Sequence, residues 1–212
     1  MLKAEHLSFA FDYPLFADIS LNIAAQESAA VLGVSGSGKS TLLHILSSFL
    51  QPKSGRVLLQ GTDIYALKPA AFNLIRREMI GLIFQQHYLF RGFSARENLE
   101  VASLLNGEMI DCDLLERLGI AHILSQDAMS LSGGQQQRLS IARVLTKKPK
   151  FIFADEPTGN LDKTNAQEAM DILFDYTERE NGALFLVTHD EAIAERATHC
   201  YRLENGALTQ IR

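Results

Sequence analysis

The chain has 212 residues, of which 47% are hydrophobic and 21% are charged, as in an ordinary globular domain with enough apolar material for a core. Its formal net charge at pH 7 is −5, and the densest basic run is the short stretch Thr146–Lys150. A duplex-binding surface needs clustered lysine and arginine, so we expect no nucleic-acid partner. Cys112 and Cys200 lie far apart and form no CxxC motif, which argues against a disulfide framework.

The sequence also lacks the usual signs of export or membrane insertion. Its first residues, MLKAEHLSFAF, contain no apolar core and no cleavage pattern, so we expect no signal peptide. The best candidate for a membrane span, Ser40–Leu50, has about half of the ~20 residues required and is interrupted by polar side chains. We therefore expect no transmembrane segment, and work at a membrane would require other chains.

The first part of the chain alternates between strand and helix patterns. Strands are predicted at Leu2–Phe11 and Asp18–Ile23 from alternation, at Ser28–Val34 from a continuous apolar run, and at Gly55–Gly61 and Ile80–Gln86. Helices are predicted from Lys39 to about Phe49 and over Ala70–Met79, with Pro69 in the first turn of the latter.

From Ser94 to about Ala128 the spacing of apolar residues becomes helical. Six leucines are predicted to line one side of a small helical lobe: Leu99, Leu104, Leu105, Leu114, Leu115 and Leu118. Beyond the lobe, helices at Gln135–Thr146 and Lys163–Glu180 alternate with strands at Lys150–Glu156 and Ala183–Asp190. This alternation predicts an α/β fold with a mainly parallel sheet in a single domain.

The segment GVSGSGKST matches the phosphate-binding pattern G-x-x-x-x-G-K-[ST], with the required strand before it and helix after it. Its glycines allow backbone N–H groups to turn towards phosphate oxygens without a Cβ in the way. We expect Lys39 to reach the β- and γ-phosphates and the Ser40 hydroxyl to bind Mg²⁺. The predicted nucleotide-binding residues here are Gly33, Ser35, Gly36, Ser37, Gly38, Lys39, Ser40 and Thr41.

The second element of the predicted nucleotide site is acidic and follows a predicted strand in the stretch FIFADE, Phe151–Glu156. Asp155 should emerge at the carboxyl end of this strand, where open α/β sheets bind ligands, and should hold Mg²⁺. Glu156 is the candidate general base for an attacking water. An acidic pair in this position is more often a helix cap, but the phosphate-binding loop favours the functional interpretation.

The stretch SLSGGQQQR, Ser130–Arg138, places two glycines and a hydroxyl at the start of a predicted helix, which is a second potential anion site. Its core, LSGGQ, resembles the signature motif of ATP-binding cassette (ABC) ATPases. Gln85 in FQQ resembles the Q-loop glutamine of that family, Gly159–Asp162 its D-loop, and His189 its switch histidine. The motifs occur in the family's order over essentially the whole chain.

This resemblance implies a P-loop NTPase ABC ATPase fold with a RecA-like, mainly parallel sheet core, an N-terminal antiparallel β region and a small helical lobe. Within a single domain over residues 1–212, residues 1–93 and 133–212 would form the ATP-binding core lobe. Residues from about 94 to 132 would form the helical lobe, which ends in the signature motif. The implied cofactors are ATP and Mg²⁺.

The resemblance also implies a head-to-tail dimer in which the signature motif of one copy faces the phosphate loop of the other. Ser132, Gly133, Gly134 and Gln135 would then cradle the γ-phosphate bound by Lys39 of the second copy. Gln85 would contact Mg²⁺ and the lytic water, His189 the γ-phosphate, and Asp162 would report across the dimer. Glu156, His189 and Gln85 are thus the implied catalytic residues, and Ser40, Gln85 and Asp155 the implied metal ligands.

Two further positions are compared with the family pattern. The adenine stacks on an aromatic residue near the N-terminus in this family, and Phe11 fits best, with Tyr13 as the second choice; either ring could equally be core. Gln26 stands where the family usually has glycine, in a turn that carries no catalytic residue.

Three classes of ABC protein are compatible with this set of motifs. A DNA-repair or chromosome ATPase would carry a long coiled coil between Gln85 and Leu131, but only 45 residues separate them here. A ribosome-associated factor would carry two cassettes, but this chain has one set of motifs. The preferred class is the ATPase subunit of a membrane transporter or mechanotransmitter, peripheral at the cytoplasmic face of the cell membrane. Ala154–Ala166 is similar to the lipoprotein-releasing, macrolide-exporting and FtsE-like cell-division subfamily. STLLHIL and FLVTHD favour the same subfamily, and most of all its lipoprotein-releasing members; a division switch and an importer stay as alternatives.

The segment Gln85–Leu99 is unusually rich in apolar side chains for a loop. At least half of Tyr88, Leu89, Phe90 and Phe93 are expected to fill the core of the helical lobe. The alternative is a groove that receives a short cytoplasmic helix of the membrane protein, with Tyr88 and Phe90 as the best candidates for its wall.

Overall fold

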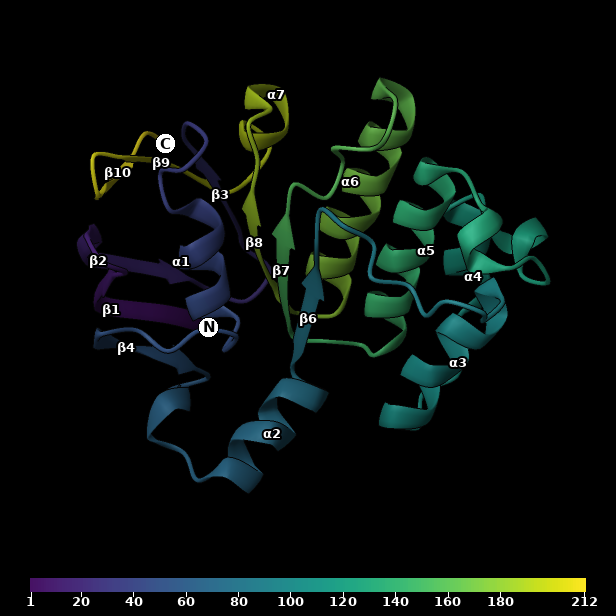
Figure 1. Ribbon diagram of the computed structural model, residues 1–212, viewed down its shortest axis with the longest axis horizontal. Coiled ribbons are helices and arrows are strands. Elements are labelled where there is room, and N and C mark those ends of the chain that lie inside the picture. The colour runs from purple at the N-terminus through teal and green to yellow at the C-terminus, as the bar shows by residue number, and fades with distance from the viewer.

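The strands form two sheets in the computed structural model, which describes residues 1–212 (Figure 1). One sheet is antiparallel with the order β2-β1-β4-β5, and the other has the order β10-β9-β3-β8-β7-β6 and is parallel except at β10. The strands are β1 Leu2–Ala10, β2 Pro14–Ile23, β3 Ser28–Leu32, β4 Ser54–Leu59, β5 Thr62–Asp63, β6 Ile80–Ile83, β7 Phe151–Asp155, β8 Ala183–Val187, β9 His199–Glu204 and β10 Ala207–Gln210.

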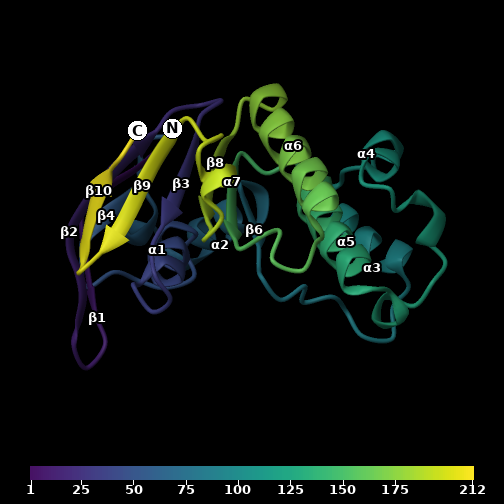
Figure 2. The same cartoon turned by 90° about the horizontal axis from the view of Figure 1, so that it is seen from above.

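The helices flank the parallel sheet and build a separate lobe beyond it. They are α1 Lys39–Leu46, α2 Pro69–Glu78, α3 Ala95–Asn106, α4 Cys112–Arg117, α5 Gly133–Thr146, α6 Lys163–Arg179 and α7 Glu191–Ala194. Figure 2 shows the antiparallel sheet at one end of the molecule and α3 and α4 at the other, with the parallel sheet between them. None of these helices combines the length and the apolar character that crossing a bilayer requires.

The antiparallel sheet follows from alternation that changes phase once. In β1 the buried residues are Leu2 and Ala4, then Leu7 and Phe9. The change occurs at His6, whose φ of 52° is left-handed and which lies where the register with β2 shifts. An irregular residue of this kind turns the strand so that both halves keep their apolar side chains on the core face.

The parallel sheet is buried on both faces, as the continuous apolar run at β3 predicts. Ala30 and Leu32 of β3 pack into one core cluster with helices α5 and α6, whereas Ala29 and Val31 pack into a second cluster with α1. Successive side chains of a strand point to opposite faces. The sheet therefore separates two cores, with α1 on one face and α5 and α6 on the other.

The helical lobe confirms four of the six predicted core leucines. Leu99, Leu114, Leu115 and Leu118 are buried, but Leu104 and Leu105 are 84% and 56% exposed, so the prediction was wrong for these two. The buried positions of α3 are Ala95, Asn98, Leu99 and Ala102, which repeat every three or four residues. Leu104 and Leu105 fall off this stripe and face away from the core.

Several predicted ends were two or three residues too long. The first helix ends at Leu46 rather than near Phe49, because Ser48 adopts a left-handed φ of 67°. Gln26, which replaces the glycine usual in the family, also has a left-handed φ, of 66°. Glycine adopts this conformation without strain, which explains why it suits this position.

Candidate active site

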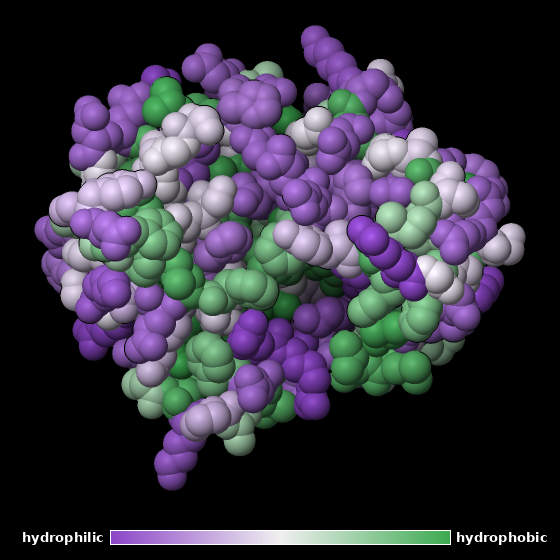
Figure 3. Space-filling model, in the orientation of Figure 1, coloured by the Kyte–Doolittle hydropathy of each residue, from purple (hydrophilic) through white to green (hydrophobic).

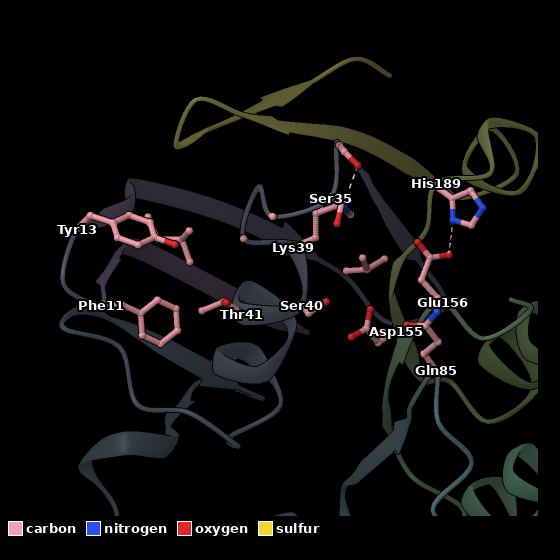
Figure 4. Close-up of a pocket in the computed structure, with 15 residues that line it drawn as sticks. Phe11, Tyr13, Ser35, Lys39, Ser40, Thr41, Gln85, Asp155, Glu156 and His189 are labelled. Atoms are coloured by element: carbon pink, nitrogen blue, oxygen red, sulfur yellow. Dashed lines mark hydrogen bonds and ion pairs between the residues drawn. The ribbon is translucent and has the colours of Figure 1, made fainter.

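The residues predicted to bind nucleotide gather at one edge of the parallel sheet. Gly33 directly follows β3, and Asp155 is the last residue of β7. Gln85 and His189 lie two residues beyond the ends of β6 and β8. Because β3, β8, β7 and β6 are parallel neighbours, their carboxyl ends meet, and these four residues line one cavity of about 510 Å³ (Figure 4).

Most of the predicted residues line this cavity, and a few do not. The lining residues are Phe11, Tyr13, Leu15, Gly33, Ser35, Gly36, Gly38, Lys39, Ser40, Thr41, Gln85, Asp155, Glu156, Val187 and His189. Ser37 is absent from the lining, and its hydroxyl is buried without a hydrogen-bond partner. Leu15 and Val187 were not predicted, because isolated apolar residues in strands carry no sequence signal for a site.

The phosphate loop requires glycine at Gly33 because the chain passes close to another strand. A Cβ there would lie 2.5 Å from the backbone oxygen of Leu203, which no side chain could relieve. The Lys39 ammonium lies across the same loop and donates hydrogen bonds to the carbonyl oxygens of Gly33, at 2.8 Å, and Val34, at 2.9 Å. Phosphate oxygens are stronger acceptors than neutral carbonyls, so a triphosphate can take over these bonds.

Glu156 and His189 form a hydrogen-bonded pair at the opposite wall of the cavity. The Nδ1 atom of His189 lies 2.9 Å from a carboxylate oxygen of Glu156, whose side chain is only 14% exposed. The backbone of Glu156 has a left-handed φ of 46° and its N–H donates to the Val187 carbonyl at 2.9 Å. Such a conformation costs on the order of 1–3 kcal/mol and is held here by the adjacent strand, which fixes the direction of the carboxylate.

The oxygen atoms that could hold a metal ion are contributed by three elements. The Ser40 hydroxyl, the Asp155 carboxylate and the Gln85 amide all line the cavity. Hydroxyl, carboxylate and amide oxygens are hard ligands that suit Mg²⁺. No group of three or more histidine, cysteine or acidic side chains in the structure is arranged so that it could hold a metal ion by itself. A Mg²⁺ ion here would therefore take its other ligands from phosphates and water, as it does in nucleotide sites.

Two exposed aromatic rings stand at the far end of the same cavity. Phe11 and Tyr13 are 59% and 62% exposed, and both line the cavity (Figure 4). Phe11 contacts Phe9 edge to face, with ring centroids 5.0 Å apart. The ring of Phe11 is thus supported from the core side while its exposed part is open to a planar ligand.

The second phosphate-binding element lies elsewhere in the chain. None of Ser132, Gly133, Gly134 and Gln135 lines the cavity. Ser132 caps α5, accepting from the Gln135 N–H at 3.3 Å and donating its own N–H to the Gln135 side chain at 3.0 Å. Figures 1 and 2 both show α1 and α5 on opposite sides of the sheet, so the two elements of one chain do not face each other.

Asp162 also lies outside the cavity. Its carboxylate caps α6 by accepting from the Asn165 backbone N–H at 3.0 Å. This bond and a second one from the Asn165 side chain hold the pKa of Asp162 below its ordinary value. Within one chain the Asp162 carboxylate therefore serves as the N-cap of α6.

A comparison of the sequence with known families is decisive. Residues 16–159 match the family described as ABC transporter. The chain belongs to the ABC transporter family. Its motifs are those of the ATP-hydrolysing cassette, so the fold class predicted from the sequence is confirmed and the chain is an ATPase.

Curated relatives of this ABC cassette align with most of its length. The lipoprotein-releasing system ATP-binding protein LolD of Shewanella oneidensis is 39% identical over 200 residues, covering 92% of this chain and 87% of the relative. LolD of Rickettsia bellii is 41% identical over 197 residues, covering 90% and 87%.

Solved structures of ABC cassettes resemble this one closely. The dimeric bacterial ABC transporter cassette MJ0796 has a TM-score of 0.88 and 30% identity, covering 100% of this chain and 99% of that one. CbiO1 of Clostridium perfringens, part of the complex cbiONQ, has a TM-score of 0.85 and 29% identity, covering 98% and 86%.

Proposed function

We propose that this ABC cassette pairs head to tail with a second copy, that the pair encloses two Mg-ATP, and that hydrolysis drives a membrane partner in lipoprotein release. The observation that carries the dimer is the separation of the two phosphate-binding elements within one chain. A head-to-tail pair brings each signature motif to the other copy's phosphate loop, so that two incomplete sites become two complete ones. MJ0796, a cassette of the same fold, forms a dimer.

The residue roles follow from the two walls of the cavity. On one wall, Lys39 and the backbone N–H groups of the phosphate loop bind the β- and γ-phosphates, and Phe11 stacks on the adenine. On the other wall stand the side chains around the γ-phosphate. Asp155 and Gln85 from this wall and Ser40 from the start of α1 would hold Mg²⁺, which would withdraw charge from the phosphate oxygens. From the second copy, Ser132, Gly133, Gly134 and Gln135 bind the γ-phosphate.

Glu156 performs the proton transfer in this proposal. Its carboxylate accepts a proton from a water whose oxygen attacks the γ-phosphorus, while the bond to the bridging oxygen breaks and ADP leaves with the electron pair. His189 holds Glu156 through the 2.9 Å contact and contacts the γ-phosphate oxygens. Loss of the γ-phosphate removes the bridge between the two copies, so hydrolysis reopens the dimer. Asp162, at the start of α6, would signal this change across the dimer.

The assignment to lipoprotein release rests on the LolD relatives, which are named as ATP-binding proteins of the lipoprotein-releasing system. Their alignments cover 92% and 90% of this chain. In this reading the cassette sits peripherally at the cytoplasmic face of the cell membrane, held there by an integral membrane subunit. A cell-division switch and an importer ATPase are the competing functions. Purification of the native complex distinguishes them, because a membrane subunit with few transmembrane helices and a large extracytoplasmic domain is expected here.

An aromatic groove beside the active site is the proposed docking surface for that subunit. It has a volume of about 540 Å³ and is lined by His44, Phe49, Phe84, Gln85, Gln86, Tyr88 and Asp155. Figure 3 shows apolar surface on both sides of a hollow in this region of the molecule. Gln85 and Asp155 line both the groove and the ATP cavity, so a helix seated in the groove would contact the metal-binding wall directly.

Most aromatic side chains of the segment Gln85–Leu99 are exposed and do not fill the core of the helical lobe. Tyr88, Phe90 and Phe93 are 61%, 45% and 40% exposed, so the prediction that at least half of the four fill the lobe's core was wrong. The reason is that α3 turns a narrow stripe inward, which Leu99 and its neighbours already occupy. Tyr88 lines the groove, but Phe90 does not, and packs against Phe93 instead.

The head-to-tail arrangement is tested by mixing two inactive variants, Lys39→Ala and Ser132→Ala. A mixed dimer contains one site with both changes and one site with neither. With random pairing, about a quarter of the wild-type ATPase rate should return, because half of the dimers are mixed and half of their sites are intact. The measurement is phosphate release from a 1:1 mixture with saturating Mg-ATP, with each variant alone as the control.

Two results would contradict the head-to-tail dimer. If heterodimers are demonstrated with two different affinity tags and the mixture is no more active than the separate variants, the sites are not shared between copies. If either variant alone retains the wild-type rate, the residue that was changed does not bind the phosphate.

A further inference from the structure

The segment of residues 84–92 connects β6 to α3. It contains Gln85, the proposed metal ligand, and Tyr88, which lines the proposed docking groove, but its backbone forms no regular hydrogen-bond pattern. Outside helices and strands, no backbone–backbone hydrogen bond of the structure involves any residue from 84 to 92. A stretch without such bonds has little intrinsic stability. Its position must therefore be set by side chains from other elements that form hydrogen bonds with it.

Two of those side chains come from the signature helix α5. The Arg143 guanidinium donates to the Tyr88 carbonyl at 2.8 Å and to the His87 carbonyl at 3.3 Å. One turn and a half earlier on α5, the Gln137 side-chain oxygen lies 2.6 Å from Nδ1 of His87, and Gln137 is fully buried. The same helix thus holds the segment at two points.

The environment of Arg143 fits this use better than a general structural role. It has no carboxylate partner, and burial alone lowers its pKa. Within the protein its charge faces the two carbonyl dipoles and the ring of Phe90, whose centroid lies 5.5 Å from the guanidinium carbon. A planar fork that donates to two consecutive carbonyls is a geometry that lysine cannot reproduce.

Other elements hold the same segment at its ends. The Asn160 side chain, in the loop before α6, donates to the Gln85 carbonyl at 3.1 Å. Asn98 of α3 accepts from the Phe90 N–H at 2.8 Å. These contacts leave the middle of the segment, His87 and Tyr88, to α5 alone.

We propose that Arg143 is a positioning residue that fastens the 84–92 segment to the signature helix, with the Gln137–His87 pair as its second attachment. The proposal rests on the proposed function in one respect, because it takes the N-terminus of α5 as the phosphate-binding end. α5 then carries a phosphate contact at its N-terminus and holds the segment through Gln137 and, in its last turn, Arg143. A displacement of the helix on closure moves Gln85 towards the metal and Tyr88 in the docking groove together.

The test compares Arg143→Met and Arg143→Lys with Arg179→Lys, an exposed arginine on α6 whose ion pair with Asp175 lies outside both sites. Loss of the fork should lower the kcat for ATP hydrolysis by roughly 5- to 50-fold in both Arg143 variants, since two hydrogen bonds to a charged group are weakened. The KM for ATP should stay within about twofold, because the phosphate loop is untouched. Arg179→Lys should match the wild type.

The second readout is hydrogen exchange, with the slow variant Glu156→Gln as the parent so that ATP is retained. Mg-ATP should protect amides at 33–41, 130–135 and 84–92 in the parent. After Arg143→Met is added, protection at 84–92 should be lost while the other two regions keep theirs. His87→Ala removes the second attachment from a loop, where it cannot unfold a helix, and should partly reproduce the loss.

The results separate the two proposals. Unchanged protection at 84–92 in both the Arg143→Met and His87→Ala proteins overturns the fastening role, as does a KM that rises in step with the fall in kcat. If the parent shows no ATP-dependent protection at 130–135, the head-to-tail site itself is wrong, and the role assigned to α5 fails with it. If Arg143→Met unfolds, the exchange and kinetic results for His87→Ala decide the question.

Discussion

Glu156→Gln should separate ATP binding from ATP hydrolysis. The substitution keeps the size of the side chain and an oxygen that can accept from His189, which lies 2.9 Å from the carboxylate. It removes only the ability to take a proton from water. Because the left-handed backbone at Glu156 is set by the adjacent strand, an amide should occupy the same position.

The magnitude follows from the role of a positioned base. Such a group contributes typically 10²–10⁴ in rate, so kcat should fall by about that factor, which corresponds to roughly 3–5 kcal/mol in the activation free energy. ATP affinity should change by less than about threefold, because Lys39 and the phosphate loop are unaffected. A closed dimer should therefore accumulate in Mg-ATP.

The assay measures three quantities on one preparation: phosphate release at saturating Mg-ATP, the Kd of a fluorescent ATP analogue, and the dimer fraction by size-exclusion chromatography with and without Mg-ATP. Glu191→Gln is the matched control, since Glu191 is a nearby carboxylate that is 74% exposed and does not line the cavity. It should hydrolyse ATP at the wild-type rate. A Glu156→Gln protein that turns over within about twofold of the wild type would remove Glu156 from the mechanism.

Three further outcomes are expected. Phe11→Ala should weaken ATP about 5- to 10-fold, the low end of base stacking, without weakening inorganic triphosphate; if Tyr13→Ala shows this pattern instead, Tyr13 is the stacking residue. Hydrogen bonds from the Ala24 N–H and from His199 lower the pKa of Glu27 below 4.5, so its stabilisation is present above pH 4.5 and is lost as the pH falls through the lower folded pKa. Glu27→Gln should therefore be less stable than the wild type at pH 7 in urea unfolding, and the difference should shrink below pH 4.5; a constant difference contradicts this. Phe153→Ala should cost about 3–5 kcal/mol in the free energy of unfolding, because Phe153 is fully buried in the core between the parallel sheet and α1, and a loss below about 1 kcal/mol would contradict the packing.

Local signals in the sequence were sufficient for the catalytic edge of the sheet. A glycine-rich loop at Gly33–Thr41, a buried strand ending at Asp155 and a histidine after β8 each sit directly beside an element whose apolar pattern is strong. Parallel strands place their carboxyl ends together, so position along the chain predicted position in space. The same logic failed for Leu104 and Leu105, because which side of α3 faces the lobe's core depends on the helices packed against it.

The sequence by itself determined the family, the fold class and most of the residues that line the ATP cavity, because phosphate loops and buried strands are short-range features encoded in consecutive residues. Only the tertiary structure placed the signature motif on the far side of the sheet from the phosphate loop, opened the aromatic groove beside Gln85 and put Arg143 under the Tyr88 carbonyl. These features depend on residues that are far apart in the chain, as the Arg143 bond illustrates with a separation of 55 positions. Such contacts depend on the packing of whole helices, and no local pattern of residue types specifies them.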